Sequence, residues 1–235
     1  MNKEELLKQA LILAGGKGMR LKSITKGSQK VLIKVGNKSF LEILLAKLKK
    51  EKFDAVNIAV GYKAEDVSLL VSQSKISLDI NLIYEKEPLG TGGAILNAFQ
   101  YIDEENILVL NGDSYNDIDY SKFLDSHLDS QNDISILTKE IDDIRRYGQV
   151  ITDQSKRIIK FNEKSSLNIN GQISLGVYGI NKNVFKNCAN RVFSFENFLS
   201  QKTGELIIGA IQMDGHFIDI GIPEDYYQFL KIYKE

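Results

Sequence analysis

The first half of the chain alternates short apolar runs with longer amphipathic stretches. The apolar runs predict four buried strands, at Ala10–Leu13, Ala55–Val60, Ile80–Tyr84 and Ile107–Leu110. Between them the sequence predicts a helix from Ser39, a helix after Tyr62 and a helix from about Gly93 to Tyr101. Strands that alternate with helices in this way form right-handed crossovers, which build a mostly parallel sheet.

The start of the helix at Ser39 is marked by its own side chains. Glu42 follows Ser39 by three residues, the spacing of a capping box in which each side chain bonds the other residue's backbone N–H. The apolar face of this helix consists of Phe40, Ile43, Leu44 and Leu48.

The pattern changes from Ile134 onward to shorter β-like segments. These are Ile134–Leu137, Gln149–Ile151, Ile158–Phe161, Ile173–Ile180, Leu206–Met213 and Phe217–Ile220. Pro223, followed by Glu224 and Asp225, predicts a last helix. We find no internal repeat, low-complexity tract or linker. We therefore expect one domain over residues 1–235, an α/β fold with three layers in which helices cover both faces of a twisted, mostly parallel sheet.

Composition narrows the class of protein. Apolar residues make up 43% of the chain and charged residues 26%, as in soluble globular proteins. The formal net charge is −1 without a run of Lys and Arg, which argues against a nucleic-acid partner. No apolar stretch has the length of a membrane span or a signal peptide, and the single Cys188 excludes an internal disulfide. We expect a cytoplasmic protein with no membrane partner. The sequence is compatible with a homo-oligomer.

The first chemical signal is the glycine loop Gly15-Gly16-Lys17-Gly18, which follows the first strand. Glycines let backbone N–H groups close around an anion, and Arg20 adds a forked cation that suits phosphate oxygens. A tight turn between a strand and a helix would use the same residues. Two other kinds of phosphate-binding loop fit the sequence poorly. The P-loop pattern is absent, and a dinucleotide-binding fingerprint that begins at Gly16 would have Leu21 in place of its third glycine.

Several distant segments then appear in a recognisable order. They are LAGGKGMRL (Leu13 to Leu21), Lys30, EPLGTGGA (Glu87 to Ala94), NGD (Asn111 to Asp113), FNEK (Phe161 to Lys164) and FIDIGIPEDY (Phe217 to Tyr226). This order resembles that of the sugar-phosphate nucleotidyltransferases over almost the whole chain. The chain is most similar to the short members that activate D-glycero-α-D-manno-heptose 1-phosphate with GTP. The resemblance implies a nucleotide-diphospho-sugar transferase-like fold, an NTP and a sugar 1-phosphate as substrates, and Mg²⁺ as cofactor.

The resemblance also implies a role for individual residues. It places around the nucleotide Leu13, Ala14, Gly15, Gly16, Gly18, Glu87, Leu89, Gly90, Thr91, Gly92 and Gly112. It assigns catalysis to Arg20, Lys30, Asp113, Lys164 and Asp219, with Asp113 and Asp219 as the metal ligands. It places the sugar phosphate against Gly148, Glu163, Lys164, Gly176 and Tyr178.

The chemistry of this reaction fits the residue types. The attacking oxygen of a phosphate monoester is already anionic near pH 7, so the reaction needs no general base. What it needs is in-line positioning of two anions and neutralisation of their charge. Two carboxylates with phosphate oxygens make a site that Mg²⁺ prefers. Taken alone, Asp113 could equally be a turn residue, Asp219 could have a structural partner, and Lys164 could be a surface lysine.

The chain departs from the family pattern at three places. Met19 stands where relatives usually have Thr or Ser, so a hydroxyl contact to phosphate is missing. Gln29 and Val31 stand where relatives have prolines, so we expect Lys30 to be held less rigidly. Ser174 opens a segment where relatives often have Asn-Ala-Gly.

These departures leave alternatives open. The acceptor could be mannose 1-phosphate, or the reaction could be cytidylyl or uridylyl transfer to another phosphorylated acceptor, since EPLGT favours guanine by resemblance only. A catalytically silent relative that binds a nucleotide sugar is the non-enzyme alternative. A nicotinamide-dependent oxidoreductase is disfavoured, because the chain lacks the dinucleotide-binding fingerprint of that class. His127 and His216 are expected to be structural or exposed.

Overall fold

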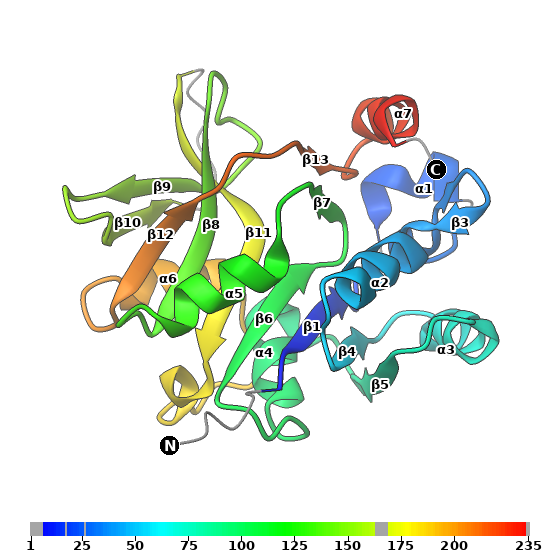
Figure 1. The fold of residues 1–235 in the computed structure, drawn as a ribbon, viewed down its shortest axis with the longest axis horizontal. Helices are drawn as coiled ribbons and strands as arrows, with labels where there is room; N and C mark the ends of the chain where they lie inside the picture. Colours follow the sequence, from blue (N-terminus) through cyan, green and yellow to red (C-terminus); the bar gives the residue numbers. More distant parts are fainter. Residues whose placement is uncertain (1–6, 17, 26, 163–168, 234–235) are drawn as a thin grey trace.

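The computed structural model describes residues 7–16, 18–25, 27–162 and 169–233. Within these residues one large sheet is formed by β1 (Gln9–Ala14), β4 (Ala55–Val60), β5 (Asp79–Tyr84), β6 (Asn106–Asn111), β8 (Ile134–Ile141), β9 (Gln149–Thr152), β10 (Ile158–Asn162), β11 (Gly171–Asn181) and β12 (Ile208–Gln212). Strands from both halves of the chain therefore enter the same sheet (Figure 1).

The centre of the sheet is parallel, as the sequence predicts. β6, β1, β4 and β5 lie side by side in this order, and each neighbouring pair is parallel. All four strands predicted for the first half are confirmed, and β4 has the predicted bounds. Beyond β6 the sheet turns antiparallel, because β11 runs antiparallel to both β6 and β8. β12 then adds parallel to β8.

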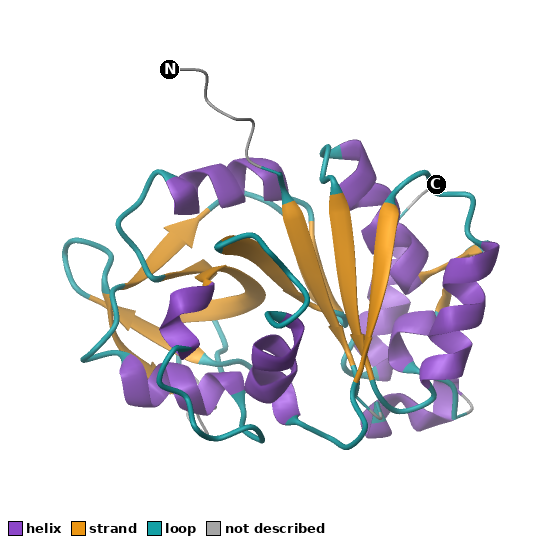
Figure 2. Cartoon of the chain, turned by 90° about the horizontal axis from the view of Figure 1, so that it is seen from below, coloured by secondary structure: helices purple, strands orange, loops and turns teal. Residues whose placement is uncertain are grey.

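Helices cover both faces of the sheet, which confirms the three-layer α/β expectation (Figure 2). The longer helices are α2 (Phe40–Lys50), α3 (Ala64–Gln73), α4 (Gly90–Ala98), α5 (Tyr120–Leu128), α6 (Phe195–Lys202) and α7 (Pro223–Ile232). Short helical segments are η1 (Met19–Leu21), α1 (Lys22–Thr25), η2 (Lys30–Leu32) and η3 (Lys182–Phe185). One hydrophobic cluster packs α2, α5 and α7 against the sheet, and the other packs α4 and α6.

The alternation of side chains along β1 divides these two clusters. Ala10 and Ile12 belong to the cluster under α2, whereas Leu11 belongs to the cluster under α4. All three are fully buried. A strand that is covered on both faces must be apolar at successive positions, which is why the central strands read as continuous apolar runs.

The predicted capping box of α2 is present. The Ser39 hydroxyl accepts the N–H of Glu42, and the Glu42 carboxylate accepts the N–H of Ser39 at 2.6 Å. The prediction for α4 was wrong in its bounds. This helix begins at Gly90 and ends at Ala98 rather than running from about Gly93 to Tyr101, because its glycine-rich first turn is held by tertiary packing.

Some elements were not predicted. These are β7 (Ser114–Asn116) and the paired strands β2 (Lys34–Val35) and β3 (Lys38–Ser39), which are too short to carry a periodic signal. β7 pairs with β13 (Phe217–Asp219), which confirms the strand predicted at Phe217–Ile220. α6 was also missed, although Ser194 caps it by accepting the N–H of Asn197. No helix in the described ranges is long and apolar enough to cross a membrane.

His127 is buried inside this fold, only 2% exposed, which bears out a structural role. Its Nδ1 lies 2.9 Å from the Ser135 hydroxyl, and its Nε2 lies 3.2 Å from the Asn106 side-chain oxygen. Because that oxygen accepts, Nε2 donates and Nδ1 accepts from Ser135, so the ring is neutral. Burial lowers the pKa of His127 to about 4, against the opposing charge of Asp133.

This burial predicts a loss of stability in mild acid. Because the folded-state pKa lies below the ordinary value near 6.5, the neutral ring stabilises the fold fully above pH 6.5. That stability is lost as pH falls toward 4. The expected loss from this group is about 3 kcal/mol. Urea unfolding at pH 7.5, 6 and 5 should show about 2 kcal/mol of this loss by pH 5. The fall in the free energy of unfolding between pH 7.5 and 5 should be smaller in His127→Gln. His216→Gln should keep the wild-type slope; an equal slope in His127→Gln would contradict the assignment.

Candidate active site

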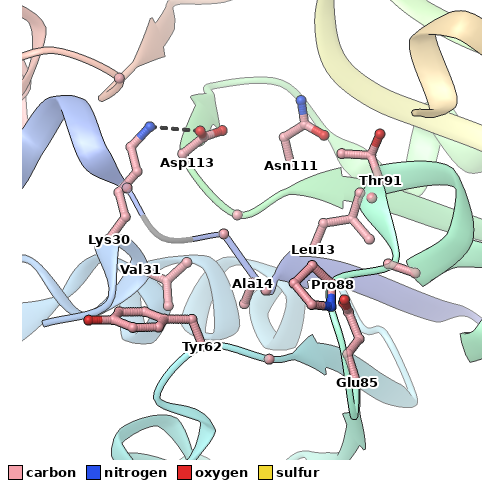
Figure 3. A pocket seen from close by; sticks show the side chains of 18 of the residues that line it. Leu13, Ala14, Lys30, Val31, Tyr62, Glu85, Pro88, Thr91, Asn111 and Asp113 are labelled. Atoms are coloured by element: carbon pink, nitrogen blue, oxygen red, sulfur yellow. Dashed lines mark hydrogen bonds and ion pairs between the residues drawn. The ribbon is translucent and has the colours of Figure 1, made fainter. Parts of the chain in front are cut away.

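A cavity of about 960 Å³ opens at the carboxyl ends of the four parallel strands. Its wall contains residues that directly follow β1, β4, β5 and β6. Open α/β sheets bind ligands at this edge, because the crossovers leave the strand ends free there. Figure 3 shows the cavity from close by, with Lys30 and Asp113 on one side and Thr91 on the other.

Most of the residues that the sequence assigns to nucleotide and catalysis meet in this cavity. Those that line it are Leu13, Ala14, Gly15, Gly16, Gly18, Arg20, Lys30, Glu87, Gly90, Thr91, Gly112 and Asp113. Leu89, Gly92 and Asp219 lie directly beside it without being part of its lining. The cavity therefore gathers segments that are about a hundred residues apart in the sequence.

The glycine loop is shaped by close backbone approach. Gly18 has φ +56°, and a Cβ there would lie 3.0 Å from the Cβ of Lys30. Gly112 donates its N–H to the Leu13 carbonyl at 3.1 Å, and a Cβ on Gly112 would lie 2.5 Å from that same oxygen. A larger residue at position 112 would clash with the Leu13 backbone. A larger residue at position 18 would have to adopt a left-handed φ and would crowd the Lys30 side chain.

Lys30 lies between the two predicted metal ligands. Its Nζ is 2.7 Å from Asp113 Oδ2 and 3.8 Å from Asp219 Oδ1, and its side chain is only 13% exposed. The two aspartates meet because the β7–β13 ladder sets Asp219 opposite Ser114, and Ile220 donates its N–H to the Asp113 carbonyl at 2.9 Å. The tertiary structure thus joins the turn between β6 and β7, which carries Asp113, to the end of β13, which carries Asp219.

Asp219 is in an electrostatic position typical of functional carboxylates. Burial raises its pKa, and the neighbouring Asp113 charge raises it further. Lys30, Arg146 and the backbone N–H of Gly221 oppose this rise. Asp219 Oδ1 is buried and accepts no hydrogen bond within the described residues. An oxygen of this kind beside a second carboxylate suits a hard cation.

The donor set is limited to these two carboxylates. Within the described ranges no group of three or more His, Cys, Asp and Glu side chains could hold a metal ion. A magnesium ion typically takes one or two protein carboxylates and completes its shell with phosphate oxygens and water. The residues present therefore fit a cation that arrives together with a phosphorylated substrate.

The two residues that flank Lys30, where relatives have prolines, are both buried. Gln29 is 1% exposed, and its amide donates to the carbonyl of Tyr62. Val31 is also buried, against Gly112. Packing and a side-chain hydrogen bond therefore contribute to holding the segment, and the lower rigidity of Lys30 expected from the missing prolines stays a prediction.

The EPLGT segment is fixed by a distant loop. The N–H groups of Gly92 and Gly93 both donate to the Phe193 carbonyl, at 3.0 and 3.2 Å, and Phe193 donates to the Leu89 carbonyl at 2.9 Å. Thr91 accepts the N–H of Phe195 at 2.8 Å and donates its hydroxyl to Glu196 at 2.9 Å. Gly92 faces the Phe193 ring, where a Cβ would lie 2.2 Å from a ring carbon. Its role in the structure is close packing.

The residues predicted to hold the sugar phosphate are more dispersed. Gly176 has φ +72° and packs on the side chain of Asn111, which lines the cavity. Tyr178 is 2% exposed and packs edge-on against Phe195, so its ring lies in the core rather than on the cavity wall. Gly148 accepts the N–H of Ser174 at 3.0 Å. Glu163 and Lys164 lie outside the described residues.

The cavity also contains residues that sequence reasoning missed, among them Tyr62, Glu85, Asn111 and Glu196. Glu85 could have been found, because it directly follows the predicted strand that ends at Tyr84. Its carboxylate accepts the Leu89 N–H at 3.3 Å, and burial raises its pKa. Glu196 could not have been found from the sequence, because it lies on α6, a helix that was not predicted. It lines the cavity and accepts a hydrogen bond from the Thr91 hydroxyl.

The chain is similar to known proteins over nearly its whole length. The family model described as nucleotidyl transferase matches residues 9–235. The chain is 40% identical over 223 residues to the D-glycero-alpha-D-manno-heptose 1-phosphate guanylyltransferase of Campylobacter jejuni subsp. jejuni, covering 94% of this chain and 98% of that protein. It is 39% identical to the protein of the same name from Aneurinibacillus thermoaerophilus, covering 93% and 95%.

A solved structure shares this fold. HddC from Yersinia pseudotuberculosis, in complex with GMP-PN, superposes with a TM-score of 0.86 at 35% sequence identity. The match covers 97% of this chain and 100% of that one.

Proposed function

The chain belongs to the nucleotidyl transferase family, and from this premise we propose that it transfers GMP from GTP to D-glycero-α-D-manno-heptose 1-phosphate, releasing pyrophosphate. The observation that carries the proposal is the cavity itself: the glycine loop, Lys30 and Asp113 line one wall, and the EPLGT segment lines another. Its relatives with about 40% identity carry the heptose guanylyltransferase name, which supports this acceptor over mannose 1-phosphate.

The residues supply positioning and charge. The acceptor phosphate oxygen attacks the α-phosphorus of GTP as its own anion, and the bond from that phosphorus to the pyrophosphate oxygen breaks. No protein base is needed for this step. The backbone N–H groups of the glycine loop hold the triphosphate, while Arg20 and Lys30 neutralise the charge that two anions bring together. Lys164 would add a cation on the acceptor side.

We propose Mg²⁺ as the cofactor, held by Asp113 and Asp219. The buried Asp219 oxygen that accepts no hydrogen bond within the described residues supports this assignment, as does the all-oxygen donor set. When bound, the ion would neutralise phosphate charge and help orient the triphosphate. Among the described residues, Lys30 is the cation whose ammonium lies within 4 Å of both carboxylates. Its positive charge offsets their mutual repulsion.

Glu85 supports guanine as the base. An ionised carboxylate only accepts hydrogen bonds, and guanine offers it two adjacent donors, the ring N1–H and the 2-amino group. Adenine and cytosine present a ring acceptor at the corresponding position, and uracil flanks its single N–H with carbonyl oxygens. We propose that Glu85, two residues before EPLGT, reads this edge of guanine. A cytoplasmic location is part of the same proposal, since GTP is abundant there and the single cysteine suits a reducing compartment.

The function is tested by pyrophosphate release from purified protein. GTP, ATP, CTP and UTP are each combined with heptose, mannose and glucose 1-phosphates, with and without EDTA. Release confined to GTP with the heptose phosphate, and abolished by EDTA, would support the proposal. Preference for mannose 1-phosphate or for CTP would replace the acceptor or the base. Saturable GTP binding without release for any pair would favour the silent relative.

Glu85→Gln should reduce the selectivity of the protein for guanine over other bases. The amide presents a donor toward one of the guanine donors, so a charge-assisted hydrogen bond is lost, and kcat/KM for GTP should fall about 10- to 100-fold. Inosine triphosphate lacks the 2-amino group and provides the sharpest comparison. Wild-type protein should prefer GTP over ITP, and Glu85→Gln should lose most of that preference. Glu65→Gln, which removes an equal charge from α3 outside the cavity lining, is the control. An unchanged GTP-to-ITP ratio in Glu85→Gln would rule out this role.

A further inference from the structure

Two adjacent arginines in the connection between β8 and β9 make very different contacts. Arg145 stays within the connection: its guanidinium binds the Asp143 carboxylate through two nitrogens, at 2.6 Å for the Nη2 contact. Arg146 instead pairs with Asp225, 79 residues away in the first turn of α7. One arginine thus stabilises a local turn, whereas the other joins two separate parts of the fold.

The Arg146–Asp225 pair is part of a larger attachment. The Arg146 guanidinium carbon lies 5.6 Å from the centroid of the Tyr147 ring. The Tyr147 ring packs edge-on against Phe217 with centroids 5.5 Å apart, and Phe217 begins β13, the strand that ends in Asp219. An ion pair and an aromatic contact therefore fix the β8–β9 connection to the segment that carries the second catalytic aspartate.

The other side of the connection is attached to β11. Gly148 accepts the N–H of Ser174 at 3.0 Å, and Ile144 is fully buried. Two residues beyond Ser174, Gly176 packs on Asn111 in the cavity wall. The connection therefore bridges Asp219 on one side and the predicted acceptor residues Gly148 and Gly176 on the other.

The partners differ in exposure in a way that favours a positioning role. The Asp225 side chain is 16% exposed and that of Arg146 is 39% exposed, whereas the Arg145 and Asp143 side chains are 51% and 44% exposed. Arg146 is absent from the cavity lining, so its guanidinium acts on the site through the connection that it anchors.

We propose that Arg146 and Asp225 form a clasp that positions the acceptor side of the active site by holding the 142–148 connection against β13 and α7. The inference rests on the proposed function, because the acceptor in question is the sugar 1-phosphate. The clasp fixes Gly148 and Gly176 relative to Asp219, so its loss should affect the acceptor side most, and the nucleotide side depends on it only through Asp219. That side is built from the ends of β1, β4, β5 and β6, none of which carries either partner.

The test compares Arg146→Ala, Asp225→Asn, the double variant and the matched control Arg145→Ala. Amide hydrogen exchange of the peptide covering residues 142–150 is measured on protein without substrates. Exchange should be faster in Arg146→Ala and Asp225→Asn, and the double variant should match the single ones, because each substitution removes the same contact. Arg145→Ala removes only the exposed contact within the turn, so it should speed this peptide's exchange much less than Arg146→Ala does, and Arg146→Lys should restore part of the protection.

Kinetics then connect the clasp to the acceptor. The KM for the sugar 1-phosphate should rise about 10-fold or more in Arg146→Ala and Asp225→Asn, a clearly larger factor than any rise in the KM for GTP. An unchanged acceptor KM, or an equal rise in Arg145→Ala, would overturn the positioning role. Unchanged exchange in both clasp variants would overturn the clasp itself. Wild-type protein that is inactive on every substrate pair would count against the proposed function instead, and the exchange measurement would still decide the clasp.

Discussion

Replacing Asp113 with Asn should lower kcat by about a hundred- to thousandfold while the protein stays folded. The side chain lies in the turn between β6 and β7, 39% exposed, with Oδ2 only 2.7 Å from the Lys30 ammonium. Asparagine keeps the shape and removes the charge, so among the described carboxylates Lys30 keeps Asp219, 3.8 Å away, as its partner. The site also loses one of the two carboxylates proposed to hold the metal. The measurement is steady-state pyrophosphate release over a range of Mg²⁺ concentrations.

The matched control for this substitution is Asp117→Asn. Asp117 is exposed just beyond β7 and lies outside the cavity lining, so the same change of charge there should leave turnover near the wild-type value. Circular dichroism and the melting temperature of both variants would exclude a folding defect. Turnover of Asp113→Asn within a few-fold of wild type would remove Asp113 from the proposed metal site.

Gly90→Ala should destabilise the fold and impair nucleotide binding together. Gly90 has φ +72°, a left-handed conformation that costs alanine about 1 to 2 kcal/mol. A Cβ there would also lie 2.5 Å from the Phe193 carbonyl oxygen, so the loop that fixes the EPLGT segment would have to move. We expect a total loss of about 2 to 4 kcal/mol and a fall in melting temperature of roughly 5 to 15 °C.

Thermal unfolding and fluorescence titration with a labelled GTP analogue measure the two effects. Gly204→Ala is the control, because Gly204 has no atom within 4 Å of an added Cβ and no left-handed φ. It should change neither stability nor affinity appreciably. If Gly90→Ala bound and unfolded like wild type, the contact between α4 and the loop before α6 would be too loose to order the nucleotide site.

The elements that could be predicted are those with local causes. β4 has the predicted bounds because every residue from Ala55 to Val60 is buried, and all of them except Asn57 are apolar. The capping box of α2 was predictable because it needs only Ser39 and Glu42, three residues apart. α6 escaped prediction although it has a Ser194 cap, since its eight residues give too short a period.

The long strand β11 shows a different limit. Its apolar residues predicted a strand over Ile173–Ile180, and a strand is present. Its partners change midway, however: the first part pairs with β8 and β9, and the second part pairs with β6 and β8. The register shifts between Ser174 and Tyr178, around the left-handed Gly176. Such a bulge depends on which strands lie on either side, and the sequence of one strand does not contain that information.

By itself, the sequence determined the alternation of strands and helices, the glycine loop and the order of motifs that identifies the family. These depend on residues close in the chain, where periodicity, caps and turn chemistry act. The tertiary structure alone decided that Asp219 stands opposite Ser114, within reach of Lys30, and that Glu196 meets Thr91. It also decided that Arg146 reaches α7 while Arg145 does not. The physical reason is that each of these contacts joins segments more than 70 residues apart, and only the packing of both helix layers on one sheet brings them together.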